Sequence, residues 1–205
     1  MKIYLVRHGN TDWNVEMRIQ GQTDVLLNSK GIAEAEHCAD YFKDIEFDKV
    51  YTSYLSRAIK TAEIITKNQY PLIKVPDLNE RHFGIWQTQL WGDIHRQIPN
   101  LKKIWKHDDG TFRPEGGESL EEMIVRVQNK FKEILNSNKK GSQILIVAHG
   151  GPLKAMIGYV LEANYNEIPN IVKQNNCCIN IINYHDTLEM DLINYVHQKW
   201  KSKTY

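Results

Sequence analysis

Two kinds of apolar pattern alternate along this chain: short continuous runs and longer stripes. The runs are rich in β-branched residues, which is typical of buried strands, and they cover Ile3–Val6, Lys49–Thr52, Ile73–Val75 and Gln143–Ala148. The stripes have an apolar residue at every third or fourth position, which predicts helices at about 29–42, 58–65, 120–136 and 152–161. Strands and helices in alternation predict an α/β three-layer sandwich, with a mostly parallel central sheet and helices on both faces.

Local signals fix several of the expected boundaries. Asn28 or Ser29 can cap the first helix, and Ser119 with Glu122 forms a capping box for the helix that ends near Asn136. Pro152 suits the first position of the next helix. Two further runs, 178–184 and 189–195, are separated by a turn and predict a hairpin-like end to the sheet.

Two stretches do not follow this alternation. Residues 10–21 are polar and predict a loop. Residues 84–118 contain Trp86, Trp91 and Trp105, and we interpret them as a small, mostly helical insertion at the sheet edge. The tryptophans fit either an ordinary core or a lid over a substrate. The prediction is a single domain, 1–205, in which 84–118 is a lid or insertion.

Composition narrows the class of partner. The 205 residues contain 26 Lys and Arg against 25 Asp and Glu, so a net charge of +1 indicates neither a nucleic-acid nor a membrane surface. The N-terminal apolar run is too short for a signal peptide, and no stretch reaches membrane-spanning length. The three cysteines, two of them adjacent, do not resemble a disulfide framework or a zinc site. We expect a soluble, cytoplasmic protein.

Charged residues follow the predicted strands. Arg7 and His8 come directly after the first strand, and His149 directly after the strand 143–148. Arg57 lies a few residues beyond the strand 49–52. Because parallel strands end at the same edge of a sheet, these side chains can face one site, although exposed strand ends are the simpler alternative. Two arginines and two histidines together predict an anion pocket.

Phosphate is the ligand that this pocket suits best. Two guanidinium groups offset the charge of a phosphomonoester dianion without a metal. The same cations lower the pKa of His8, and a neutral histidine is a competent nucleophile. Glu80 follows a strand and is a candidate proton donor to the leaving oxygen, with Asp77, Glu115 and Glu118 as competitors.

The charged motifs together resemble the histidine phosphatases, the phosphoglycerate-mutase-like superfamily. The matching segments occur in the family's order over nearly the whole chain: Arg7-His8-Gly9 with Asn14, Arg18-x-Gln20-Gly21, Ser56-Arg57-Ala58, Leu78-x-Glu80 with Phe83-Gly84, Gly116-Gly117-Glu118-Ser119 and His149-Gly150-Gly151. The resemblance implies a phosphohistidine on His8 and no metal or other cofactor. It also implies phosphate contacts from Arg7, Arg57 and His149, and Glu80 as acid and then base.

The same resemblance places substrate contacts on Asn14, Gln20, Gly21, Arg81 and Gly150. Arg81 after Glu80 is similar to the mutase, but the mutase's longer basic insertion is missing, and the short chain favours a phosphatase. The leading hypothesis is a metal-independent phosphomonoesterase for a small phosphorylated metabolite, and a homodimer is expected to form. A 2,3-bisphosphoglycerate-dependent phosphoglycerate mutase is the alternative. A phospho-ligand binding protein without turnover is a third hypothesis.

Overall fold

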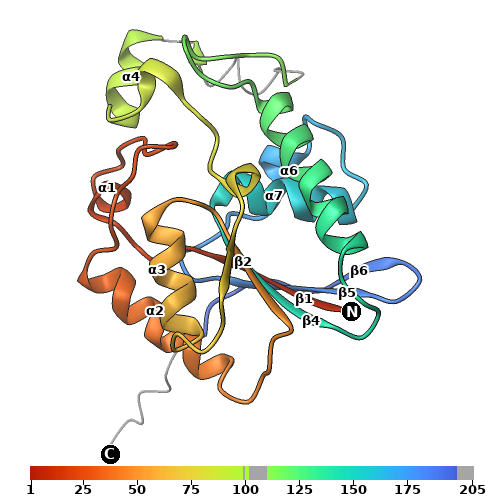
Figure 1. Ribbon diagram of the computed structural model, residues 1–205. Coiled ribbons are helices and arrows are strands. Elements are labelled where there is room, and N and C mark those ends of the chain that lie inside the picture. Colours follow the sequence, from red (N-terminus) through yellow and green to blue (C-terminus); the bar gives the residue numbers. More distant parts are fainter. Residues whose placement is uncertain (99, 102–109, 198–205) are drawn as a thin grey trace, which may run out of the picture.

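A six-stranded sheet runs through the centre of the molecule (Figure 1). The structure, a computed structural model, describes residues 1–98, 100–101 and 110–197. The order across the sheet is β3-β2-β4-β1-β5-β6. The strands, in chain order, are β1 Lys2–Arg7, β2 Lys49–Thr52, β3 Leu72–Lys74, β4 Gln143–Ala148, β5 Ile179–Tyr184 and β6 Leu188–Tyr195. The four predicted runs and the terminal hairpin are therefore confirmed, with shifts of one residue at some ends.

The sheet is mixed rather than wholly parallel. β3, β2, β4 and β1 pair in parallel, whereas β5 is antiparallel to both β1 and β6. The register between β1 and β4 matters most for function, because Arg7 lies opposite Ala148 at the last pair. His8 and His149, the next residue of each strand, consequently leave the sheet side by side at one edge.

Helices cover both faces of the sheet, as the alternation predicts. α2 and α3 lie on one side of it, and α6 and α7 lie on the other (Figure 1). The helices are α1 Asp12–Val15, α2 Ser29–Tyr41, α3 Ser56–Ile65, α4 Trp91–Gln97, α6 Leu120–Asn136 and α7 Gly150–Val160, with 3-10 turns η1 Pro76–Leu78, η2 Gly84–Trp86 and η3 Ile168–Asn170. The three-layer α/β architecture follows from these positions.

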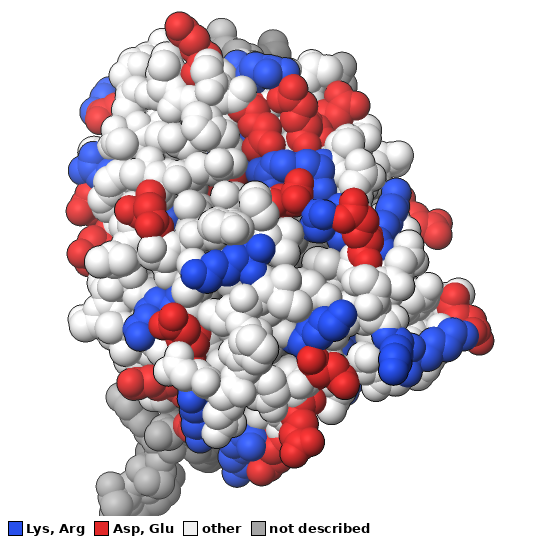
Figure 2. Space-filling view, in the orientation of Figure 1, with Lys and Arg blue, Asp and Glu red and all other residues white. Residues whose placement is uncertain are grey.

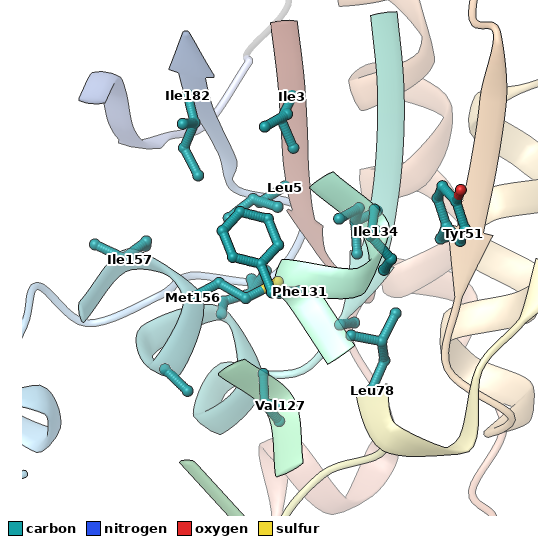
Figure 3. Close-up of a cluster of buried hydrophobic side chains, with 14 of the residues drawn as sticks. Ile3, Leu5, Tyr51, Leu78, Val127, Phe131, Ile134, Met156, Ile157 and Ile182 are labelled. Atoms are coloured by element: carbon teal, nitrogen blue, oxygen red, sulfur yellow. The ribbon is translucent and has the colours of Figure 1, made fainter. Parts of the chain in front are cut away.

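Each face of β1 contributes to a different core. Ile3 and Leu5 pack with α6 and α7, where Phe131 and Met156 are fully buried (Figure 3). The alternate residues, including Tyr4, pack against α2 and α3 on the other side. Burying both faces explains the continuous apolar run of this strand. Packing on both faces therefore holds the end of β1, where Arg7 and His8 lie, in place.

The capping box predicted for α6 is present. The Ser119 hydroxyl accepts from the Glu122 backbone N–H at 3.1 Å, and the Glu122 carboxylate accepts from the Ser119 N–H at 2.8 Å. Both satisfy donors that a helix start leaves free. α2 similarly begins after Asn28, whose side chain accepts from the Gly31 N–H.

Two expectations need correction. Residues 12–15 form the short helix α1, because Thr11 and Asn14 cap it reciprocally, where a loop was predicted. α7 begins at Gly150, so Pro152 is its third residue; proline is tolerated there because the first-turn N–H groups have no helical partner. In its described part, the insertion has the turn η2, the helix α4 and a loop at 111–118, and Trp105 lies outside the described residues.

The surface carries both signs of charge. Figure 2 shows acidic and basic side chains interspersed over the face seen, in keeping with the net charge of +1. Within the described residues, no helix combines the length and apolar character needed to cross a membrane.

Candidate active site

The two histidines predicted to share a site are neighbours. His8 and His149 follow β1 and β4, and their ring centroids lie 5.1 Å apart. Both are buried, with exposed fractions of 3% and 0%. Thr61 on α3 braces the corner after β1: its hydroxyl accepts from the Gly9 N–H at 3.0 Å and donates to the Arg57 carbonyl at 2.7 Å. The alternative of exposed strand ends does not apply here.

The geometry around His8 determines which of its nitrogens is free. Its Nδ1 lies 2.7 Å from the Gly9 carbonyl oxygen, which can only accept a hydrogen bond. Burial first, and then Arg57 and Arg7, hold the pKa of His8 well below its ordinary value, so the ring is neutral near pH 7. The single proton is therefore on Nδ1, and Nε2 carries the lone pair that a nucleophile needs.

His149 is held by a residue that the sequence interpretation did not assign a role. Its Nε2 lies 2.7 Å from the Ser53 hydroxyl, and that hydroxyl already accepts from the Leu55 N–H at 3.1 Å. Burial and the nearby cations, Arg57 foremost, also lower the pKa of His149 and keep it neutral. We assign its proton to Nδ1, because the Ser53 hydroxyl accepts from the Leu55 N–H and donates its own hydrogen to Nε2. Nε2 is then the acceptor, and Nδ1 carries the remaining ring N–H.

Both predicted arginines are anchored by one part of their guanidinium groups; Arg57 is buried and Arg7 is half-buried. Arg7 Nη1 donates to the Gln174 carbonyl at 2.6 Å, and Arg57 donates to the carbonyls of Thr23 and Gly21 at 2.9 and 2.7 Å. Arg57 is only 1% exposed, and burial lowers its pKa to about 10. It is still charged at neutral pH, so the site holds a permanent positive field.

Three buried nitrogens of this cluster have no hydrogen-bond partner in the described part of the chain: Arg7 Nε, Arg57 Nε and His149 Nδ1. All three carry hydrogens under the assignment above. A buried donor without an acceptor destabilises the folded protein by about 1–3 kcal/mol, more if charged. Because three such donors surround a neutral histidine, the natural occupant is an anion with several acceptor oxygens, such as a phosphoryl group.

The side chain of Glu80 contacts the start of α7. Its carboxylate accepts from the Arg81 N–H at 2.9 Å and from the Gly151 N–H at 3.3 Å. A Cβ at position 151 would be only 2.4 Å from Glu80 Oε1, so glycine is required for this approach. Arg126 holds the backbone at Glu80 by donating to its carbonyl at 3.2 Å.

A pocket of about 340 Å³ opens over these groups and is lined by Arg7, His8, Arg57 and Glu80. The three carboxylates that competed with Glu80 at the sequence level do not line it in the described structure. Glu118, for example, pairs with Arg126 at 2.6 Å. Among the described residues, Glu80 is thus the acidic side chain that lines this pocket.

All five predicted substrate-binding residues line the same pocket: Asn14, Gln20, Gly21, Arg81 and Gly150. Their side chains are not equally available. The Asn14 amide oxygen accepts from the Thr11 N–H and hydroxyl, which leaves its NH₂ group as a donor. Arg81 instead donates to the carbonyls of Glu118 and Phe112, at 2.9 and 2.8 Å, and so holds the insertion.

The insertion forms one wall of the pocket. Phe83 and Trp91 line it, with ring centroids 5.8 Å apart. Backbone hydrogen bonds join this wall to the segment after α1: Ile19 N to Gln89 O at 2.9 Å, and Trp91 N to Met17 O at 3.0 Å. The tryptophan at 91 therefore faces the pocket, whereas Trp86 is buried in a small core with Ile94.

Sequence reasoning missed two residues here, Ser53 and Lys154. Ser53 sits at a strand end, but nothing in its local sequence indicates a contact with a histidine 96 positions away. Lys154 lines the pocket from α7. Its spacing of four residues from Gly150 was an available signal, because residues four apart share a helix face.

The comparisons with known proteins agree with this geometry. Residues 3–194 match the profile of the histidine phosphatase superfamily, branch 1. The chain belongs to this superfamily. The phosphatase PhoE of Bacillus subtilis is 30% identical over 99% of this chain and 93% of its own length. A 2,3-bisphosphoglycerate-dependent phosphoglycerate mutase of Cytophaga hutchinsonii is 33% identical over 82% and 81% of the two chains.

A solved structure shares the histidine phosphatase architecture closely. It is the mycobacterial glucosyl-3-phosphoglycerate phosphatase in complex with VO3, which superposes with a TM-score of 0.86 at 27% identity and covers 94% of this chain and 98% of its own. The fold class and the phosphatase assignment predicted from the sequence are confirmed by these relatives.

Proposed function

We propose that this histidine phosphatase hydrolyses phosphate monoesters of small metabolites by transferring the phosphoryl group to His8 and then to water. The observation that carries the proposal is the set of three buried N–H donors that find no acceptor among the described residues, beside a histidine whose Nδ1–H is held by the Gly9 carbonyl. The pocket of about 340 Å³ is near the lower limit of small-molecule sites, which supports a compact substrate.

In the first step, His8 Nε2 attacks phosphorus and the bond to the leaving oxygen breaks. Arg7, Arg57 and His149 donate to the phosphoryl oxygens, where negative charge is held in the transition state. Glu80, which lines the same pocket, gives a proton to the leaving alkoxide. The two guanidinium groups balance the dianion, so no metal is needed for charge neutralisation.

In the second step, water attacks the phosphohistidine. Glu80, now a carboxylate, takes a proton from that water, the N–P bond breaks, and inorganic phosphate leaves. His8 returns to its neutral form with the proton on Nδ1, still held by the Gly9 carbonyl. The anchored Nδ1–H keeps Nε2 directed to the same position through both steps.

A mutase is the second candidate, because a mutase is among the relatives. It would need the phosphoenzyme to wait for a phosphoglycerate rather than water. Hydrolysis is the better-supported outcome here, since the guanidinium of Arg81 is bound to the carbonyls of Glu118 and Phe112.

The test is phosphate release from a panel of sugar, glycerate, nucleotide, amino-acid and aryl phosphates with a metal chelator present. We expect turnover by the wild-type chain that resists the chelator and is lost in His8→Ala. Isomerisation of phosphoglycerate that depends on bisphosphoglycerate and outpaces phosphate release would favour the mutase. Turnover by His8→Ala at the wild-type rate would refute the mechanism.

We also infer a cytoplasmic location and a homodimer. The location is supported by Cys38, Cys177 and Cys178, which are all buried as free thiols. The dimer is a prediction that sedimentation of the purified chain checks.

A further inference from the structure

Lys154 is a cation of the pocket that the phosphoryl chemistry does not use. It lies on α7 four residues after Gly150, which places it on the same helix face one turn further along. It lines the same pocket as His8 and Glu80. Its ammonium donates to the Pro169 carbonyl at 2.6 Å, and this single contact leaves two N–H donors.

The ammonium of Lys154 has no carboxylate partner among the described residues. Other cations near the pocket differ, since Arg18 pairs with Glu16 at 2.7 Å and Arg126 with Glu118 at 2.6 Å. Burial lowers the pKa of Lys154, the charge of Glu80 opposes that shift, and Arg7 adds to it. A half-buried cation without a counterion is unfavourable unless a ligand supplies the charge.

The position of Lys154 limits the length of such a ligand. Backbone positions 150 and 154 lie one helical turn, about 5.4 Å, apart along α7. Lys154 and Glu80 line the same pocket, and the charge of Glu80 acts on Lys154, so an anionic group at Lys154 is a short chain away from a leaving oxygen at Glu80. Apolar side chains border the pocket on this side, from α6 (Leu120 and Met123) and from η3 (Ile168). A compact two- or three-carbon chain fits this interval better than a polyhydroxylated sugar.

We propose that Lys154 binds a second anionic group on the alcohol part of the substrate. The enzyme then prefers phosphate esters of small hydroxy acids, or small bisphosphates, over esters of neutral alcohols. This inference rests on the proposed function and names the substrate class of that site.

The experiment compares kcat/KM for three esters with a three-carbon chain. These are 3-phosphoglycerate, with a carboxylate; glycerol 3-phosphate, which is neutral at that end; and propane-1,3-diol bisphosphate, with a second phosphate. We expect the wild-type chain to prefer one or both of the anionic esters over glycerol 3-phosphate by about ten- to a hundredfold, the range for one charge-assisted contact. Whichever is preferred identifies the second anion.

Lys154→Met keeps the aliphatic stem but removes the charge, and we expect it to lose the preference through a higher KM for the anionic ester. Turnover of glycerol 3-phosphate should fall far less. Lys154→Arg should keep most of the preference, because it keeps the charge. Lys60→Met, which removes an exposed lysine from α3, is the control for a general effect of net charge and should keep the preference in full.

Several outcomes would overturn the subsite. They are equal wild-type rates on the neutral and anionic esters, a preference that survives Lys154→Met, an equal fall on all three esters, or no hydrolysis of the anionic esters. The equal fall would mean that Lys154 only tethers the Pro169 loop. Turnover of p-nitrophenyl phosphate separates the failure of this inference from the failure of the proposed function. If the wild-type chain hydrolyses this ester and His8→Ala does not, only the subsite has failed. If the wild-type chain does not hydrolyse it, the proposed function is contradicted.

Discussion

The two ends of the pocket are built differently. The phosphoryl end stands on the carboxyl ends of β1 and β4, where His8 and His149 are 3% and 0% exposed and are held by hydrogen bonds of 2.7 Å to the Gly9 carbonyl and the Ser53 hydroxyl. The leaving-group end is formed by the insertion and the outer turn of α7, with Phe83, Trp91 and Lys154 at half-buried positions. Buried, braced groups suit a fixed chemical step, and peripheral side chains suit selection among substrates. Variants at the two ends should therefore change different kinetic constants.

Arg57→Ala is the variant at the phosphoryl end from which we expect a very large effect. It removes a charge and a donor to the transferred group, and it also frees the carbonyls of Gly21 and Thr23. Loss of one such donor costs about a hundred- to a thousandfold in kcat, and the added charge places this variant at the upper end. Arg57→Lys, which keeps the charge without the planar fork, should recover part of the rate. A kcat near the wild-type value in Arg57→Ala would contradict the proposal that the phosphoryl end carries out the chemical step.

Ser53→Ala tests the assigned tautomer of His149. Without the hydroxyl, neutral His149 can place its proton on Nε2, and the donor to the phosphoryl group is lost in part of the population. We expect kcat to fall about ten- to a hundredfold, less than removal of a donor outright. The ¹⁵N shifts of labelled histidine should show Nδ1 protonated in the wild type and a tautomer mixture in the variant. An unchanged His149 spectrum would contradict the assignment, whatever the rate.

Glu80→Gln should separate good leaving groups from poor ones. An alkyl phosphate needs the proton that Glu80 supplies, so its phosphoryl transfer should slow by about a hundredfold or more, whereas p-nitrophenyl phosphate needs little help. Gly151→Ala places a Cβ 2.4 Å from Glu80 Oε1 and should act in the same direction. Gly92→Ala, whose added Cβ meets nothing closer than 3.9 Å, is the matched control. A uniform loss for both leaving groups would remove Glu80 from the role of acid.

The smallest expected effect is on stability against pH. Burial holds the pKa values of His8 and His149 well below 6.5, so the unfolded chain binds more protons than the folded chain as the pH falls below that value. Stability is therefore complete above about pH 6.5 and is lost on acidification, by up to about 1.4 kcal/mol per pH unit for each histidine. Denaturant unfolding between pH 7 and 5, in phosphate-free buffer, should show a weaker pH dependence for His149→Gln. An identical dependence would contradict the buried neutral histidine.

Much of the fold was predictable because its signals are local. The runs 49–52 and 143–148 match β2 and β4 residue for residue, and the capping box at Ser119 fixed the start of α6. Where prediction failed, tertiary or subtle capping effects were responsible. α1 depends on a Thr11–Asn14 reciprocal cap within a polar stretch, and α7 begins at Gly150, two residues before the proline that was predicted to start it.

The residues of the site also differ in whether local sequence signals predict them. Strand ends and the parallel arrangement brought His8, His149, Arg7 and Arg57 together in prediction, and the structure places them within one pocket or against it. Ser53 could not be assigned from sequence, because its role depends on a side-chain contact between distant segments. Arg81 lines the pocket, and its guanidinium also bonds to carbonyls of the insertion, a contact that local sequence does not reveal.

The central claim is that the phosphoryl group passes through Nε2 of His8. Rapid acid-free quenching of the chain with a ³²P-labelled ester, followed by peptide mass spectrometry, tests it directly. The account predicts an acid-labile, base-stable phosphate on His8, formed at least as fast as turnover and absent in His8→Ala. Turnover without any phosphoenzyme under these conditions, or a phosphate on another residue with His8→Ala still active, would contradict it.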